Sequence, residues 1–225
     1  VYIILALTFG YTLIMAETSL GRMTRKSPVG AFESFGNSRF ISIGGWINAI
    51  IPILIVPYYS VIGGWVIKYL IEYFAGHSKT LAGDAYFTTF ISNGWSTEIC
   101  FIIFTLFTLG IIYAGVRNGI ERVSKFMMPI LIVLSLIIAV YSVTRPGAIE
   151  GVKYFLVPNF DHFSWMTVVS AMGQMFYSLS IAMGILITFG SYMKKDTSIE
   201  KSTENVEIFD TAIAIMAGLM IIPAV

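Results

Sequence analysis

Residues 178–184 read Ser178-Leu179-Ser180-Ile181-Ala182-Met183-Gly184 and stand at the centre of the longest uncharged run of the chain, His162 to Met193. As one helix, the 32 residues of this run would extend about 48 Å, whereas the hydrocarbon core of a bilayer is about 30 Å thick. The small and hydroxyl side chains at 178–184 therefore predict that a membrane-spanning helix is broken there. Backbone without helical hydrogen bonds is tolerated within a membrane only around a cavity or inside protein, so we expect a ligand site at the break.

The composition predicts an all-α, polytopic integral membrane protein. Hydrophobic residues make up 56% of the chain and charged residues 12%, and the mean hydropathy is +0.81. A soluble domain carries about twice that charge. We expect a single transmembrane domain over residues 1–225, truncated at both ends because Val1 and Val225 lie inside apolar runs, and no signal peptide. The uncharged runs predict six helices, at residues 1–25, 40–74, 97–115, 119–144, 164–194 (broken near 178–184) and 204–225.

The charges of the loops predict the topology, because Lys and Arg concentrate in loops that face the cytoplasm. The loop at 26–39 with its flanks holds four basic residues against one acid, and the loop at 116–119 with its flanks holds three against one. The second loop has one base against two acids, Asp84 and Glu98, and the fourth has two of each, with Asp161 among its acids. We therefore expect loops 26–39, 116–119 and 195–203 in the cytoplasm, although the last is mixed in charge.

Several functional classes are disfavoured by the residues that the chain lacks. A single cysteine, Cys100, excludes an internal disulfide, and His77 and His162 are too few for the usual zinc or haem ligation. The spans contain no paired carboxylates, Ser-His set or metal cluster, so we expect no enzyme, and no nucleic-acid partner is expected either. An ion channel lacks support because neither a repeated carbonyl filter nor a ring-forming acidic motif is present.

The broken helix has the chemistry of a carrier site. Its first half would present negative carbonyl ends to the gap and its second half positive amide ends, so one site could hold a cation and a carboxylate together. The hydroxyls of Ser178 and Ser180 suit a hard cation such as sodium, while Tyr177 and Met183 offer apolar surface. In the competing interpretation, the serines bond back to their own helix and Gly184 marks tight packing.

The second expected helix contains two prolines followed by two tyrosines. Pro52 and Pro57 free backbone carbonyls in the second helix, and Tyr58 and Tyr59 follow them. These tyrosines either line a cavity or pack against neighbouring helices with their hydroxyls on backbone carbonyls.

Two carboxylates also lie at unusual positions, because ionisable groups within spans are costly and usually face the bundle interior or water. With a helix start near Glu204, Asp210 would lie about 9 Å along the axis, past the interface. Alternatively, Asp210 is a first-turn acid that the helix dipole favours. Glu17 either pairs with Arg22 at the cytoplasmic edge or has a buried gating role.

The chain resembles the neurotransmitter:sodium symporter family, in particular its bacterial amino-acid members with the LeuT-type fold. The matching motifs are distributed over nearly the whole chain. Their order and spacing correspond to the second through seventh helices of the family. The motifs are Glu17-Thr18-Ser19-Leu20-Gly21-Arg22, Pro57-Tyr58-Tyr59 with Gly64-Trp65, Asn118-Gly119-Ile120-Glu121-Arg122-Val123-Ser124-Lys125-Phe126-Met127-Met128-Pro129, and Gly173-Gln174-Met175-Phe176-Tyr177-Ser178-Leu179-Ser180 with Gly190-Ser191-Tyr192.

The resemblance implies roles for the residues that match the family's substrate site. Tyr59 would contact the substrate carboxylate, and Ile55, one turn earlier, would line the side-chain pocket. Tyr177 would act as an outer aromatic gate. Ser180 with Met183 would floor the pocket in the unwound segment.

The resemblance also implies an ion site. Ser178 would supply ligands to the sodium nearest the substrate, and Tyr2, Gln174, Ser178 and Asp210 map onto positions that surround chloride or its substitute. Chloride-dependent members have Asn and Ser where this chain has Asp210 and Ala214. A carboxylate next to sodium could replace the Coulombic role of the halide, because a cation in a low-dielectric site needs a nearby anion.

Together these observations predict a secondary transporter that imports a hydrophobic or aromatic amino acid with Na+ by alternating access and without chloride. The alternative is a proton-coupled amino-acid transporter on the same scaffold, with Asp210 titrating. The expected partners are the amino-acid substrate and the lipid bilayer. A homodimer is a possible assembly. The resemblance implies that the first family helix, which donates much of the coordination, precedes this sequence in the whole protein.

Overall fold

The computed structural model describes residues 1–36, 38–83, 85–158 and 163–224. These residues form helices and connecting segments without a strand. Four residues that the predictions used lie outside this description. Asp84 and Asp161 were counted in the loop charges, His162 begins the long uncharged run, and Val225 ends the last expected helix. The chain divides into two compact units, the first formed by Val1–Pro52 and Pro129–Val225 and the second by Ile53–Met128.

The first span of unit one is a single helical run with a π-helical turn in it. The run consists of α1 (Tyr2–Leu5), the π-helix η1 (Ala6–Gly10) and α2 (Tyr11–Thr24). It ends because Arg25 adopts a left-handed conformation (φ 53°) and its N–H donates to the carbonyl of Gly21.

The expected loop at 26–39 contains a short helix, α3 (Pro28–Glu33), which was not predicted. The side chain of Ser27 accepts a hydrogen bond from the N–H of Gly30, and Pro28 occupies the first helical position. A capping hydroxyl followed by proline is a start signal for a helix, because proline has no N–H that would need a partner there.

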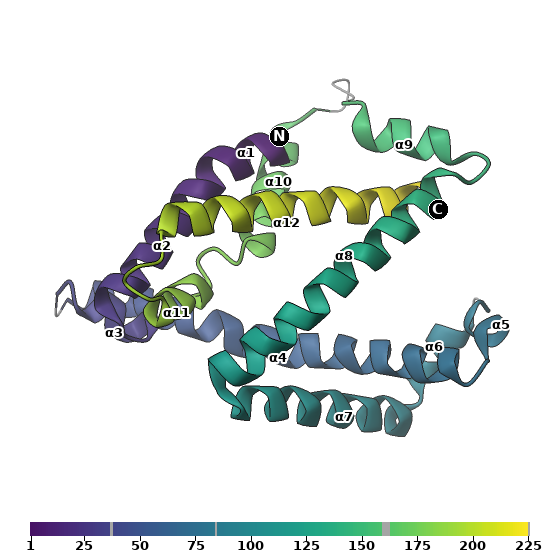
Figure 1. Ribbon diagram of the computed structural model, residues 1–225, viewed down its shortest axis with the longest axis horizontal. Helices are drawn as coiled ribbons and strands as arrows, with labels where there is room; N and C mark the ends of the chain where they lie inside the picture. The colour runs from purple at the N-terminus through teal and green to yellow at the C-terminus, as the bar shows by residue number, and fades with distance from the viewer. Residues whose placement is uncertain (37, 84, 159–162, 225) are drawn as a thin grey trace. The chain divides into compact units, whose positions relative to one another are not determined.

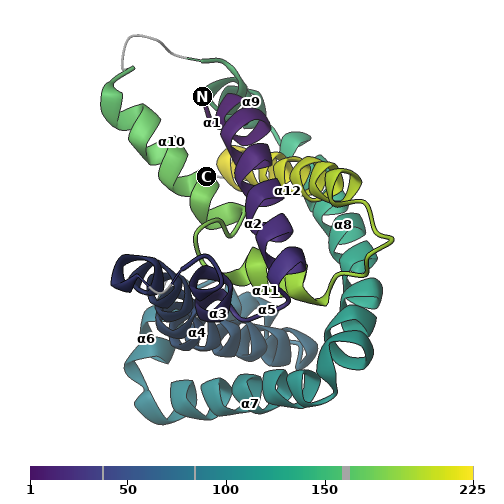
Figure 2. The same cartoon turned by 90° about the vertical axis from the view of Figure 1, so that its left-hand side faces the viewer.

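The predicted break in the fifth helix is confirmed. Residues 165–178 form α10 (Trp165–Ser178), residues 185–192 form α11 (Ile185–Tyr192), and the stretch between them is not helical. Figures 1 and 2 show the two half-helices joined by this stretch. Three of its residues have positive φ angles: Ser180 at 56°, Ala182 at 60° and Gly184 at 67°.

The last long helix begins earlier than expected. Helix α12 (Ile199–Ile221) starts at Ile199 rather than near Glu204, because the side chain of Ser198 caps it by accepting from the N–H of Lys201 at 3.3 Å. Residues 199–203 are therefore helical rather than part of a loop at 195–203. Asp210 lies about 16 Å along the axis, which excludes the interpretation of Asp210 as a first-turn acid.

Helices α2 and α11 pack with their backbones in contact, and two glycines permit this approach. A Cβ at Gly21 would overlap the carbonyl oxygen of Ile187, and a Cβ at Gly190 would overlap the carbonyl oxygen of Thr18. A cluster of buried hydrophobic residues lies in the same unit. It consists of Ala6, Ile14, Met175, Leu179 and Ile181.

A second contact within unit one holds the end of α12. The helix α9 (Ala148–Leu156), which was not predicted, packs against the 3-10 turn η3 (Ile222–Ala224). A Cβ at Gly218 would overlap the ring of Phe155, and the Ser142 hydroxyl, on α8 (Glu121–Val143), donates to the carbonyl of Met220 at 3.0 Å.

Unit two is built around two long helices. One is the second half of α4 (Arg39–Phe74) and the other is α7 (Gly94–Tyr113), which begins before the expected residue 97 because the side chain of Asn93 caps it. A Cβ at Gly64 would lie 2.8 Å from the backbone nitrogen of Phe101, so the two helices are in close contact.

The other elements that lie wholly within unit two are short. They are α5 (Ser78–Leu81), α6 (Tyr86–Ser92) and the π-helical turn η2 (Val116–Ile120). The expected loop at 116–119 is part of η2, so the prediction of a loop there was wrong.

Five helical segments in the described residues are long and apolar enough to cross a membrane. Helices α10 and α11, with 14 and 8 residues, are each shorter than a bilayer requires, as a broken helix must be. The all-α polytopic membrane fold is therefore confirmed. The five segments are Tyr2–Thr24, Arg39–Phe74, Gly94–Tyr113, Asn118–Val143 and Ile199–Ala224.

The contact between α2 and α11 makes a prediction for stability. The substitution Gly190→Ala should lower the free energy of unfolding by about 1–3 kcal/mol, because the added methyl meets backbone that cannot turn away. Thermal unfolding of the purified full-length protein measures this change. Gly110→Ala is the matched control, because a Cβ at Gly110 meets no atom within 4 Å. Equal melting temperatures for the two variants would contradict the proposed close approach.

Candidate functional site

The linker between α10 and α11 turns its backbone groups out of the helical hydrogen-bond pattern. Ser180 and Ala182 hold left-handed conformations although they are not glycines, which costs conformational energy. At Gly184 the left-handed conformation coincides with crowding, because a Cβ there would lie 2.7 Å from Cγ of Pro28 and 2.9 Å from the carbonyl oxygen of Asn48. The surrounding elements must therefore hold this geometry in place.

The carboxylate of Glu17 on α2 holds the middle of the linker. Its Oε1 accepts a hydrogen bond from the N–H of Ala182 at 2.7 Å, and Oε2 is buried without a partner among the described residues. The alternative pairing of Glu17 with Arg22 is not seen, because the guanidinium of Arg22 donates to the carbonyl of Thr197 instead. Whether Glu17 is a gate stays a prediction.

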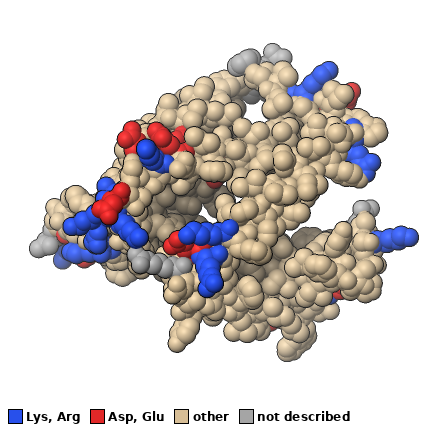
Figure 3. Space-filling model, in the orientation of Figure 1, with Lys and Arg blue, Asp and Glu red and all other residues tan. Residues whose placement is uncertain are grey.

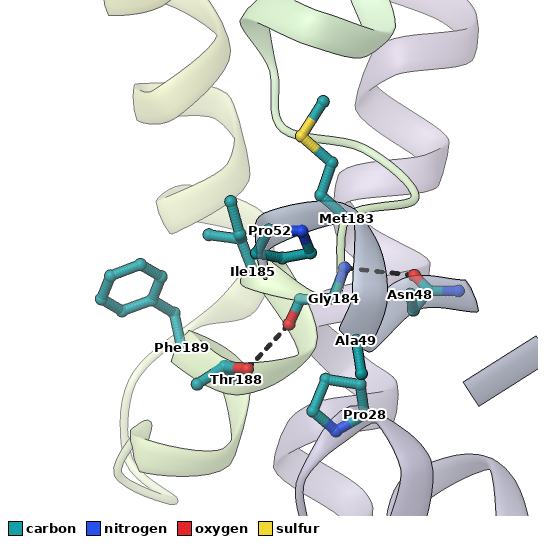
Figure 4. Close-up of a pocket in the computed structure, with 9 residues that line it drawn as sticks. All are labelled: Pro28, Asn48, Ala49, Pro52, Met183, Gly184, Ile185, Thr188 and Phe189. Atoms are coloured by element: carbon teal, nitrogen blue, oxygen red, sulfur yellow. Dashed lines mark hydrogen bonds between the residues drawn. The ribbon is translucent and has the colours of Figure 1, made fainter. Parts of the chain in front are cut away.

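The amide of Asn48 on α4 holds the start of α11. Its Oδ1 accepts from the N–H of Gly184 at 3.1 Å, and its Nδ2 donates to the carbonyl of Gly44 at 3.0 Å, which orients the amide. The hydroxyl of Thr188 donates to the carbonyl of Gly184 at 2.8 Å, as Figure 4 shows. Our sequence reading missed Asn48, although an amide in an otherwise uncharged span is a signal that a polar partner must be nearby.

A carboxylate and two hydroxyls meet at the other end of the linker. The hydroxyl of Ser178 donates to Oδ2 of Asp210 at 2.7 Å, and the phenol of Tyr2 donates to the same oxygen at 3.4 Å. The three side chains come from α10, α12 and α1, so the tertiary structure brings this predicted group together. Gln174, expected to complete the group, is exposed and makes no hydrogen bond to it within the described part of the chain.

Two cavities flank the linker. One, of about 430 Å³, is lined by Ser178, Ser180 and Asp210 together with apolar residues of α2, α11 and α12. The other, of about 370 Å³, is mainly apolar and has Met183 and Asn48 in its wall, as Figure 4 shows. Ser180 and Met183, expected to floor one pocket together, thus line different cavities.

The first cavity offers oxygen ligands of the kind that hard cations prefer. The carboxylate of Asp210 and the hydroxyls of Ser178, Ser180 and Thr18 line it. The hydroxyl of Thr203, another residue of its wall, is buried and has no partner in the described residues. A buried hydroxyl without a partner loses its hydration, so this part of the cavity favours a polar or charged ligand.

The remaining predicted residues belong to α10 and to unit two. Tyr177 is 40% exposed at the end of α10, where the expected gate would stand. Ile55 and Tyr59 lie on the part of α4 within unit two, where the rings of Tyr58 and Tyr59 meet edge to face at 5.3 Å between centroids. The roles of Ile55, Tyr59 and Tyr177 in substrate binding stay predictions from the resemblance.

Comparison with known proteins gives consistent matches along the chain. A family model described as the Sodium:neurotransmitter symporter family matches residues 72–225. The uncharacterized sodium-dependent transporter YhdH of Bacillus subtilis is 32% identical over 100% of this chain and 51% of its own length. An uncharacterized sodium-dependent transporter of Haemophilus influenzae is 29% identical over 99% of this chain and 52% of its own length.

A solved structure matches as well. The crystal structure of MhsT in complex with L-phenylalanine has a TM-score of 0.87 and 34% identity, and the match covers 99% of this chain and 52% of that chain. The chain therefore spans about half the length of the relatives that it matches.

The contact of Asn48 with Gly184 makes a testable prediction. The substitution Asn48→Leu leaves the buried N–H of Gly184 without its acceptor, which should cost about 1–3 kcal/mol. Hydrogen exchange of the full-length protein should show faster exchange in the peptide that covers residues 182–186.

Ser60→Ala serves as the control on the same helix, because the hydroxyl of Ser60 bonds only back to the carbonyl of Val56 among the described residues. Unchanged exchange in the Asn48→Leu variant would show that Asn48 does not hold the linker.

Proposed function

Because this chain belongs to the sodium:neurotransmitter symporter family, we propose that the whole protein imports an amino acid together with Na+ by alternating access. The family consists of membrane transporters and not of enzymes. The observation that carries the proposal is the broken helix, with the carboxylate of Asp210 bonded to Ser178 where α10 ends. A carboxylate within a bundle of apolar helices is costly unless it serves a ligand or a partner.

The linker geometry limits which groups of the site would bind a ligand. The amides of Ala182 and Gly184 donate to Glu17 and Asn48, so they hold the linker and do not bind a substrate carboxylate. The hydroxyl side of the linker, at Ser178 and beside Asp210, is where a sodium ion would find oxygen ligands. Ion and substrate that share one site raise each other's affinity by the same factor, which is the thermodynamic basis of coupling.

The substrate that we propose is a hydrophobic or aromatic amino acid. Apolar side chains, among them Met183 and Phe189, dominate the walls of the cavities beside the linker. The related MhsT was crystallised with L-phenylalanine. In the whole protein, Ile55 and Tyr59 would add to the substrate pocket and Tyr177 would close it.

We further propose that transport does not need chloride. The carboxylate of Asp210 accepts hydrogen bonds from Ser178 and Tyr2 and supplies a fixed negative charge beside the cavity. In the plasma membrane, the end of α2 would face the cytoplasm, as its basic residues indicate. The alternation of the spans would place the start of α12, which is mixed in charge, on the same side. The alternative, proton coupling through Asp210, uses the same geometry.

The two coupling modes are distinguished by uptake into proteoliposomes that contain the full-length protein. A sodium gradient should drive uptake of phenylalanine, and replacement of chloride by gluconate should leave the rate within about two-fold, because Asp210 supplies the negative charge. Uptake driven by a pH gradient without sodium would instead support proton coupling. Loss of uptake in gluconate would refute chloride independence.

A substitution tests the role of Asp210 directly. Asp210→Asn removes the negative charge but keeps the shape of the side chain, so the apparent affinity for sodium should fall at least about ten-fold, and added chloride should restore part of it. Glu204→Gln is the matched control, because Glu204 is an exposed acid on the same helix. If both substitutions changed sodium affinity equally, Asp210 would have no special place at the ion site.

A further inference from the structure

A third hollow lies away from the linker, where α2 ends. It has a volume of about 630 Å³ and contains three cationic side chains but no acidic residue in its wall. Figure 3 shows Lys and Arg side chains, with Asp and Glu side chains beside them, over this end of α2 and over α3. The lining residues are Ser19, Arg22, Met23, Arg25, Lys195 and Ile199, and we call this hollow the α2-end pocket.

The three cations come together because of the tertiary structure. Arg22 and Arg25 lie at the end of α2, whereas Lys195 lies in the segment between α11 and α12. The guanidinium of Arg22 donates to the carbonyl of Thr197, 175 residues away in the sequence, and this bond holds that segment against α2. The left-handed conformation of Arg25 ends α2, and Arg25 is part of the pocket wall.

Within the described residues, Arg22, Arg25 and Lys195 form no salt bridge with an acidic side chain. Asp196 and Glu200 are neighbours in sequence but do not line the pocket. Cations held together repel one another, so an anion bound among them would lower the electrostatic energy.

The position of the pocket relative to the membrane indicates where such an anion would come from. The span Tyr2–Thr24 has 23 residues, a length of about 35 Å, so its end lies at the level of the lipid headgroups. Met23 is 67% exposed, and with Ile199 it gives the pocket an apolar wall. An arginine guanidinium matches the oxygens of a phosphate group with two parallel hydrogen bonds.

We propose that the α2-end pocket binds a phosphate group, supplied by the headgroup of an anionic phospholipid. The cations contact the phosphate, and the side chains of Met23 and Ile199 contact the adjoining glycerol and acyl carbons. The same phosphate chemistry could be supplied by free inorganic phosphate, and the experiment below separates the two sources.

The preference of basic residues for one side of the membrane would place charge at this end of α2 without any pocket. A matched pair of lysines distinguishes that explanation from a binding site. Lys195 lines the pocket, whereas Lys194, with the same charge and one residue away, does not. Net charge alone predicts equal effects for the two lysines.

The test measures lipid retention on the full-length protein by native mass spectrometry, after reconstitution in phosphatidylcholine with phosphatidylglycerol. Lys195→Gln and Arg25→Gln should each weaken phosphatidylglycerol retention about five-fold, as expected for one basic residue at an anionic surface. Lys194→Gln and the charge-conserving Arg25→Lys should stay within about two-fold of the unsubstituted protein. Arg22 is left unchanged because it also holds Thr197.

A second arm uses inorganic phosphate with lipid-free detergent micelles at constant sodium and ionic strength. Thermal stabilisation by phosphate that Lys195→Gln abolishes and Lys194→Gln preserves would establish the phosphate site with a soluble ligand. Selective retention of phosphatidylglycerol would establish it with a lipid.

Equal effects of the two lysine substitutions, or no effect of phosphate and phosphatidylglycerol, would overturn the proposal. Melting temperatures of all variants without added ligand identify any variant that fails to fold.

Discussion

The structure depends on one constraint, which is that backbone N–H and C=O groups inside a membrane must find partners. The helix that breaks after Ser178 loses the regular partners of several such groups. The N–H of Ala182 is satisfied by Glu17, and the N–H of Gly184 by Asn48. The break therefore exists only because polar side chains from two other helices reach it, and those side chains must themselves lie in apolar spans.

Close helix packing makes that reach possible. Gly21 and Gly190 let α2 and α11 touch along their backbones, and this places the carboxylate of Glu17 within hydrogen-bond distance of the linker. A larger residue at either glycine would separate the helices, so the packing and the polar contact depend on each other. Small residues at helix contacts are the usual means of close approach within membranes.

The two halves of the broken helix are held by different elements. Through Ser178, the end of α10 is joined to Asp210 on α12, whereas the start of α11 is joined through Gly184 to Asn48 on α4. A ligand that binds between these two contacts would affect both the hydrogen bond at the end of α10 and the hydrogen bond at the start of α11. A transporter that alternates between two states needs such separately held parts, because each ligand can shift the equilibrium only through contacts that differ between the states.

The sequence by itself determined the class of fold and the position of the break, because hydrophobicity, run length against bilayer thickness and the small residues at 178–184 are local properties of the chain. The motifs also indicated the family and the group around Asp210. Only the tertiary structure decided that Asn48 holds Gly184 and that Ser180 and Met183 line separate cavities. The cavity assignments and the Asn48 contact are decided by which helix faces come together, and that choice depends on packing between residues far apart in sequence.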